Sequence, residues 1–145
     1  MKVIIAGAGE VGTHLAKLLA RESFDITLLD ENSERLTDLE ANYDLITRVG
    51  SSTSIENLKE CNVNKADLFI ALTPYETVNM TACMLATNLG AKHTLARIEN
   101  YEYLRNENKE LFAKLGVDHL IIPEKLAAEE IVESIHSPWL RQSIK

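Results

Sequence analysis

The chain has 145 residues, of which 46% are hydrophobic, and this length and composition predict one globular domain with a core of its own. The 15 basic and 22 acidic residues leave a net charge of −7, which argues against a nucleic-acid partner or attraction to anionic lipid. Cys61 and Cys83 form no CxxC pair and no apolar run reaches the roughly 18 residues of a membrane span, so we expect a cytoplasmic protein with reduced thiols and no membrane insertion.

The first apolar run, 2–6, predicts a strand that leads directly into the turn Gly7-Ala8-Gly9-Glu10-Val11-Gly12. A helical pattern follows, with apolar residues at Val11, Leu15, Leu18 and Leu19. In a dinucleotide-binding GxGxxG turn, Gly7 permits the sharp turn, Gly9 leaves room for a pyrophosphate, and Gly12 lets the helix lie close to the sheet. The start of the helix then points its free N–H groups at the phosphates. The alternative is an ordinary structural glycine turn.

A second strand is predicted at 25–30, and it ends in Asp30. A carboxylate at this point accepts hydrogen bonds from the hydroxyls of an adenosine ribose, so the strand, the glycine turn, the helix and the acid are in register for a nucleotide. The same carboxylate repels a 2′-phosphate, which favours NAD(H) or an adenosine nucleotide over NADP. Arg35 is in a position to offset that repulsion, but we expect it to be a solvated charge on the next helix.

The rest of the chain alternates helical patterns with short apolar runs. We expect helices at about 32–42, 53–62, 76–89 and 101–115, and strands at 44–49, 66–71, 93–97 and 118–122. Alternation of this kind is typical of an α/β fold in which a parallel sheet is covered on both faces. Six strands predict a Rossmann-like, doubly wound sheet of order 3-2-1-4-5-6, with the ligand crevice at the carboxyl ends of strands 1 and 4.

One more amphipathic helix is predicted at 124–136, after the sheet is complete. Its apolar face, from Leu126 to Ile135, either covers the sheet or meets a second copy of the chain, and we take self-association as the hypothesis to test. The expected nucleotide-binding domain therefore spans 1–136. Residues 137–145 break the helix and are expected to form a truncated linker.

Ligand-binding residues of this fold lie just after the strands, so their positions are predicted without any alignment. Gly50, Ser51 and Ser52 shape either an adenine pocket or a polar turn that caps the next helix. Arg97, at the end of an apolar strand, requires an anionic partner, either a phosphate or an internal carboxylate. The complete predicted cofactor site comprises Gly7, Ala8, Gly9, Glu10, Val11, Gly12, Asp30, Glu31, Gly50, Ser51, Ser52, Leu72, Thr73, Glu76, Asn79 and Arg97, with Thr73, Glu76 and Asn79 facing the distal half of the ligand.

The sequence shows no arrangement of residues for catalysis. His14 is expected on a helix surface, His93 and His119 at the starts of strands, and His136 at the end of a helix, and no HExxH or GxSxG occurs. A dehydrogenase also needs a second set of residues that holds the substrate and moves a proton. We therefore predict a binding module with no catalytic residue and no metal ligand, rather than an enzyme.

Several segments in combination resemble a known family. They are 3–12, 29–30, 49–52, 65–67, 72–73 with Glu76 and 79–83, 96–98 and 122–124. Together they resemble the nucleotide-binding lobe of RCK (KTN) domains, and in particular the TrkA family of potassium-uptake regulators, over residues 1 to about 140.

The resemblance implies a cytoplasmic regulatory subunit, peripheral to the inner face of the cell membrane, that controls a membrane potassium transporter. Such a subunit binds NAD(H) or ADP/ATP without turning it over, and it forms a homodimer or higher homo-oligomer. The resemblance also implies phosphate contacts at Gly7, Gly9 and Gly12, ribose contacts at Asp30, and an Arg97 available to a phosphate. It further implies that the linker at 137–145 leads toward a second lobe that this sequence lacks.

Two positions depart from the family pattern. Ser51 stands where many relatives have Asp, and Glu10 stands where some ATP-sensing relatives have Arg, which favours NAD(H) over ATP. The rival interpretations are the cofactor-binding fragment of an NAD-dependent dehydrogenase and an adenine-nucleotide sensor unrelated to ion transport.

Overall fold

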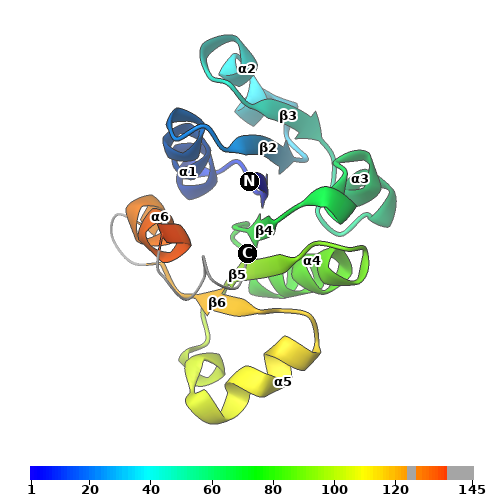
Figure 1. Ribbon diagram of the computed structural model, residues 1–145, viewed down its shortest axis with the longest axis vertical. Helices are drawn as coiled ribbons and strands as arrows, with labels where there is room; N and C mark the ends of the chain where they lie inside the picture. The colour runs from blue at the N-terminus through cyan, green and yellow to red at the C-terminus, as the bar shows by residue number, and fades with distance from the viewer. Residues whose placement is uncertain (124–126, 137–145) are drawn as a thin grey trace.

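The computed structural model describes residues 1–123 and 127–136. Its strands are β1 (Lys2–Ala6), β2 (Asp25–Asp30), β3 (Ile46–Val49), β4 (Leu68–Ala71), β5 (His93–Arg97) and β6 (His119–Ile121). They form one six-stranded sheet of parallel pairings in the order β3-β2-β1-β4-β5-β6 (Figure 1). The predicted doubly wound, Rossmann-like topology is therefore confirmed.

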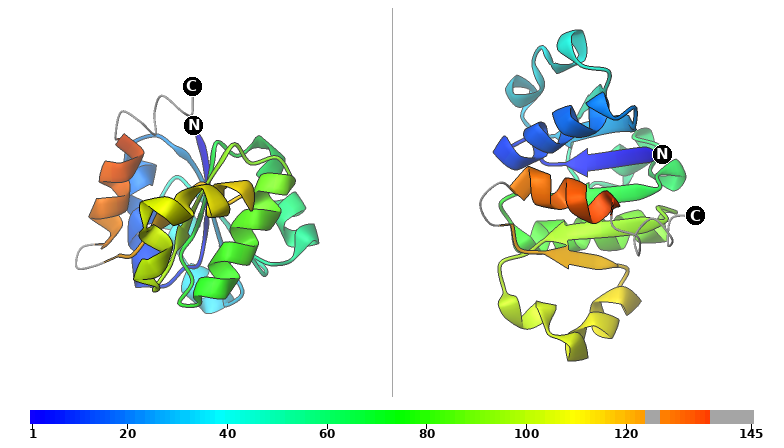
Figure 2. Two further views of the ribbon diagram at one scale, coloured as in Figure 1. Left: turned by 90° about the horizontal axis from the view of Figure 1, so that it is seen from below. Right: turned by 60° about the vertical axis from the view of Figure 1, so that its left-hand side comes forward.

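Helices connect the strands and cover both faces of the sheet. The α-helices are α1 (Glu10–Arg21), α2 (Leu39–Asn42), α3 (Ile55–Glu60), α4 (Glu76–Asn88), α5 (Lys109–Lys114) and α6 (Ala127–His136), and the 3₁₀ helices are η1 (Ser33–Leu36), η2 (Val63–Lys65), η3 (Tyr101–Leu104) and η4 (Asn106–Asn108). Apolar side chains of α1, α2 and α6 pack on one face, and those of α3, α4 and α5 pack on the other. Figure 2 shows α1 and α6 side by side, with the sheet between them and α4.

Strand β1 shows why the apolar runs of the sequence are continuous rather than alternating. Successive side chains of a strand point to opposite faces of the sheet. Val3 and Ile5 belong to the core on the α1 side, whereas Ile4 and Ala6 belong to the core on the α4 side. All four side chains are fully buried, because helices cover both faces.

The helix predicted at 32–42 is interrupted. Its first part is the 3₁₀ helix η1, and α2 begins only after Asp38, whose φ of 65° lies in the left-handed region. The Asn32 side chain accepts a hydrogen bond from the backbone N–H of Glu34. Such short-range bonds give the backbone an alternative to a continuous helix, and the prediction missed this competition.

The helix predicted at 101–115 is also wrong in its first half. This segment contains η3 and η4, and only 109–114 is α-helical. The Asn100 side chain accepts a hydrogen bond from the Glu102 N–H, and the Asn108 side-chain amide donates one to the Glu102 carbonyl. Asparagine side chains that bind neighbouring backbone groups again shorten the helix.

Helix α6 covers the sheet, and this outcome corrects the hypothesis of self-association through its apolar face. Ala128, Ile131 and Ile135 are buried in the core that β1 and α1 build. At its edges, His14 lies 3.6 Å from Glu129, and His136 lies 2.6 Å from Glu22. The face is therefore occupied within the chain and is not free to meet a second copy. Leu126 and the linker predicted at 137–145 fall outside the described residues.

None of the helices in the described part of the chain combines the length and the apolar character that a bilayer crossing requires.

Candidate functional site

A cleft of about 270 Å³ opens at the carboxyl ends of the central strands. The turn after β1 contributes Gly7 and Gly9, and the end of β2 contributes Leu29, Asp30 and Glu31. The loop after β3 contributes 50–53, and the segment after β4 contributes 72–75. Nine of the predicted site residues therefore meet in one cleft, namely Gly7, Gly9, Asp30, Glu31, Gly50, Ser51, Ser52, Leu72 and Thr73.

Gly7 and Gly12 each have a reason within the protein to be glycine. Gly7 has a φ of 108°, and a Cβ there would lie 2.9 Å from the backbone of Leu72 and Thr73. A Cβ on Gly12 would overlap the carbonyl oxygen of Gly7, so this glycine allows α1 to start close to the sheet. These two residues build the turn as the sequence predicted.

Gly9 has no such reason. Its φ of −75° and ψ of −165° are extended values that other residues also adopt, and a Cβ built there would meet no atom within 4 Å. Gly9 is also the N-cap of α1 and supplies no side-chain hydrogen bond to the first turn. The first N–H groups of α1, which have no partner inside the helix, therefore receive no side-chain cap from Gly9, and this residue leaves space beside them.

Asp30 links the glycine turn to the loop after β2. Its Oδ2 accepts a hydrogen bond of 2.6 Å from the Ala8 N–H, and its Oδ1 accepts one of 2.8 Å from the Asn32 N–H. Only 10% of the side chain is exposed. A carboxylate has about four lone-pair sites, so each oxygen keeps capacity for a ribose hydroxyl while it holds the turn in place.

Arg35 is closer to the site than the sequence indicated. Because the predicted helix is broken, Arg35 lies on η1, where its guanidinium approaches Asp30 Oδ2 at 3.8 Å. It lines the cleft and also a shallow groove in front of α1. The other residues of this groove are Ala8, Gly9, Glu10, Thr13, His14 and Lys17. His14, Lys17 and Arg35, which carry or can carry positive charge, thus line a groove beside the start of the helix. Exposed Glu10 adds a negative charge to the same groove.

The sequence left two roles open for the segment 50–52, part of a ligand pocket or a polar turn that caps the next helix. It lines the cleft, and it also forms the capping turn of α3. The Ser51 N–H donates to Asn57 Oδ1 at 2.8 Å, and Ser54 Oγ accepts from the Asn57 N–H at 3.1 Å. A Cβ on Gly50 would lie 2.7 Å from Asn57 Oδ1, so this glycine makes room for the cap.

Asn79 lies behind the cleft rather than in it. The residue is fully buried, and its Oδ1 accepts from the N–H and the hydroxyl of Thr73. Its amide donates to the carbonyls of Thr73 and Arg97. Every polar atom of this side chain thus serves the loop after β4 and the end of β5, so Asn79 positions Thr73 instead of facing a ligand.

Glu76 and Arg97 also lie outside the cleft lining. Glu76 Oε1 accepts from the N–H groups of Glu99 and Asn100, each at 2.9 Å, and so ties the loop after β5 to the start of α4. Within residues 1–123 and 127–136, no carboxylate lies within ion-pair distance of the half-buried Arg97. Val11 and Gly12 belong to the first turn of α1 and line neither the cleft nor the groove.

The site prediction missed several residues that line the cleft. They are Leu29, Arg35, Thr53, Tyr75 and Val78. Thr53 and Tyr75 extend segments that the sequence already placed after strands, so a wider window around each strand end would have included them. Arg35 required knowledge of the η1 turn, and Val78 required the orientation of α4.

The two cysteines lie in the core on the α4 side. Burial raises the pKa of the Cys83 thiol, and it raises that of Cys61 despite the opposing charge of Arg48. A thiol with a raised pKa forms little thiolate at neutral pH, so neither side chain is a reactive nucleophile.

A larger cavity, of about 350 Å³, lies beside β6 and α5. Tyr103, Leu104, Phe112 and Val117 form its apolar wall. It exceeds the cleft in volume, but it contains neither the glycine turn nor the start of α1. Ligands of doubly wound sheets bind at the carboxyl ends of strands where the strand order reverses, so the cleft at β1 and β4 is the better candidate.

Known proteins are similar to this chain in sequence. Residues 3–123 match the TrkA-N domain family. The Trk system potassium uptake protein TrkA of Haemophilus influenzae is 43% identical over 145 residues, which cover 98% of this chain and 31% of that protein. The chain spans about a third of the length of such curated relatives.

Solved structures share the fold. The TrkA-N domain of the inner membrane protein ybaL from Escherichia coli gives a TM-score of 0.71 at 15% identity, over 93% of this chain and 96% of that one. The GsuK channel bound to NAD gives a TM-score of 0.67 at 19% identity, over 83% of this chain and 21% of that chain, and GsuK is also known bound to ADP. The match over residues 3–123 and the identity to the Haemophilus protein show that this chain belongs to the TrkA-N domain family.

Proposed function

We propose that this chain is a nucleotide-binding regulatory domain that binds NAD(H) or ADP/ATP without turnover. Gly9 is the observation that carries the proposal. The protein itself has no need of a glycine there, and the missing side chain leaves the uncapped start of α1 open to a pyrophosphate.

The shape and the chemistry of the site support this assignment. The cleft of about 270 Å³ lies below the roughly 300 to 1,000 Å³ that is typical of pockets for drug-sized ligands, so it suits the nucleoside part of a nucleotide. The open groove beside it, with His14, Lys17 and Arg35, suits the phosphates.

Charge ranks the candidate ligands. Exposed Glu10 lines the groove proposed for the phosphates, and its negative charge disfavours the third phosphate of ATP. We therefore place NAD(H) ahead of ATP. Asp30 disfavours the 2′-phosphate of NADP, and Arg35 at 3.8 Å offsets only part of that charge. The GsuK structures bound to NAD and to ADP support both ligand classes for this fold.

We also propose that the domain belongs to a cytoplasmic regulator of a membrane potassium transporter, where it acts as a homodimer or larger homo-oligomer. The names of its curated relatives support the link to potassium uptake. Because α6 is buried in its own core, self-association requires a surface other than the one that the sequence indicated.

Gly9→Val tests the nucleotide site. The variant should fold like the wild-type chain, because a Cβ at this position meets no protein atom within 4 Å, yet it should bind no nucleotide. Thermal unfolding with NADH, NAD, NADP, ATP and ADP measures both properties. A ligand present at about 100 times its Kd stabilises the wild-type chain by about 2.7 kcal/mol, and this gain should vanish in the variant.

Gly12→Ala is the matched control for the turn. Its Cβ overlaps the Gly7 carbonyl, so this variant should lose stability without any ligand present. Unchanged nucleotide affinity in a folded Gly9→Val variant would contradict the site. Oxidation of NADH with a simple carbonyl substrate would instead support the dehydrogenase alternative.

The link to potassium transport needs a test in cells. This chain can replace the matching segment of a full-length relative, with and without Gly9→Val. We expect potassium uptake to depend on the chimera and to lose its response to nucleotide in the variant. Uptake that is the same with and without the chimera would refute the proposed role in transport.

A further inference from the structure

Tyr75 is a large aromatic residue at the rim of the cleft. It is 66% exposed, yet it lines the cleft together with Pro74 and Val78. A single exposed apolar residue is common on protein surfaces, so the exposure of Tyr75 alone does not indicate a role in binding. Its backbone and its surroundings are more informative.

The backbone of Tyr75 is held in place from within the protein. The Thr73 hydroxyl lies 3.3 Å from the carbonyl oxygen of Tyr75 and 3.3 Å from its N–H. Thr73 is in turn fixed by the fully buried Asn79. The main chain at the rim is therefore rigid, while the ring extends from it without burial in the core.

The other residues that line the cleft differ in chemistry. Leu29 and Leu72 are buried and apolar. The loop after β3 contributes residues 51–53, which are all hydroxyl-bearing. Apolar side chains, an aromatic ring and hydroxyl groups in one cleft suit a flat heteroaromatic base, whose faces are apolar and whose edges form hydrogen bonds.

We infer that Tyr75 is the base-positioning residue of this cleft and that its ring packs against the adenine of the bound nucleotide. The inference rests on the proposed nucleotide site, which places the ribose at Asp30 and the phosphates before α1. The base then occupies the remaining part of the cleft, between the loop after β3 and the loop after β4. Tyr75 adds a contact that depends on the base and not on the phosphates.

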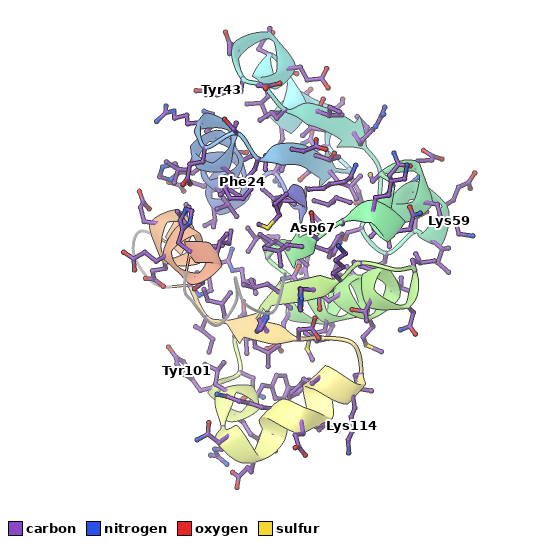
Figure 3. The ribbon with its side chains drawn as sticks, in the orientation of Figure 1. Phe24, Tyr43, Lys59, Asp67, Tyr101 and Lys114 are labelled. Carbon is purple, nitrogen blue, oxygen red and sulfur yellow. The ribbon has the colours of Figure 1, made fainter. Side chains whose placement is uncertain are left out.

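Binding measurements on the 145-residue chain test this role. Tyr75→Ala should weaken ADP and NADH about tenfold, in the range of base–aromatic stacking, whereas Tyr75→Phe should stay within about twofold of the wild type. Inorganic pyrophosphate, which has no base, should compete with equal strength in all three proteins. Tyr101→Ala is the matched control, because Tyr101 is 64% exposed and lies on η3 at the edge of the molecule beside α5 (Figure 3).

The outcomes separate this inference from the proposed function. Wild-type chain that binds neither ADP nor NADH refutes the nucleotide site itself. Wild-type binding with equal affinity in Tyr75→Ala overturns only the role of Tyr75. An equal loss for pyrophosphate and for ADP also overturns it, because the effect would then not come from the base.

Discussion

At the scale of single residues, position in the chain and role in the site are different properties. Asn79 and Thr73 both follow β4 in the sequence, and both were expected to face a ligand. Thr73 lines the cleft, whereas Asn79 is fully buried and makes four hydrogen bonds to backbone and side-chain groups of the protein. A polar residue on the first turns of a helix has no sequence signal that separates these two roles.

Asn79→Ala should therefore destabilise the fold and weaken nucleotide binding indirectly. The substitution leaves the Thr73 N–H and the Arg97 carbonyl without their partner, and one unsatisfied buried group costs about 1 to 3 kcal/mol. We expect the free energy of unfolding, measured with urea, to fall by about 2 to 3 kcal/mol.

Asn88→Ala is the matched control on the same helix. Asn88 is exposed, and its amide donates only to the Met84 carbonyl of α4. A surface substitution of this kind changes stability by about 0.5 kcal/mol or less. Equal losses in the two variants would mean that the buried network of Asn79 contributes little.

At the scale of elements, α6 was the least determined part of the sequence prediction. Its amphipathic pattern fits a helix on the sheet and a helix between two copies equally well. Contact with α1 decides between them, since Ile131 and Ile135 are at most 1% exposed. The same face that indicated a dimer therefore completes the core of the monomer.

Ile131→Glu should unfold the domain instead of releasing a folded monomer. A buried carboxylate without a partner costs several kcal/mol, and domains are stable by only about 5 to 15 kcal/mol. Circular dichroism should show loss of helix or a much lower urea midpoint. Leu111→Glu on α5 is the matched control, because this leucine is 55% exposed and tolerates a charge. If sedimentation showed a folded, monomeric Ile131→Glu variant, that result would support self-association through the apolar face of α6.

At the scale of the whole molecule, stability depends on pH through groups that folding moves out of water. Burial lowers the pKa of His119 below its ordinary value of 6.5, the carboxylate of Asp118 opposes this shift, and His93 adds to it. The unfolded chain takes up this proton at higher pH than the folded protein does. Protonation therefore favours unfolding, and stability falls as the pH decreases below about 7.

His119→Gln should reduce this decline. The free energy of unfolding should change less between about pH 7.5 and 5.5 in the variant than in the wild type, as measured by urea titration. His14→Gln is the control, because the His14 side chain is 48% exposed and is not buried as His119 is. An identical pH profile for wild type and His119→Gln would show that the burial of His119 is not the cause.

Asp67 acts in a more acidic range and does not disturb that test. Partial burial opposes ionisation, but the Lys2 N–H at 2.8 Å and the Lys92 ammonium at 3.2 Å outweigh it and hold the pKa of Asp67 below 3.8 (Figure 3). This stabilisation is complete above pH 3.8 and is lost as the pH falls through the lower, folded-state pKa.

The sequence by itself determined the strand order and the nucleotide turn. Apolar runs bounded by glycines and acids are local signals, and the right-handed connection between parallel strands leaves few topologies for them. The reasons for Gly7 and Gly12 follow from one local geometry, and the structure places Asp30 beside that turn as expected.

Only the tertiary structure decided which polar residues reach the cleft and which hold it together. Glu76, Asn79 and Arg97 lie near the site in the chain but outside its lining, whereas Arg35 and Tyr75 enter it. The reason is that a side chain's role depends on which neighbours satisfy its hydrogen bonds, and those neighbours come from distant strands and loops. The same holds for α6, whose partner surface is set by packing between segments more than 100 residues apart in the chain.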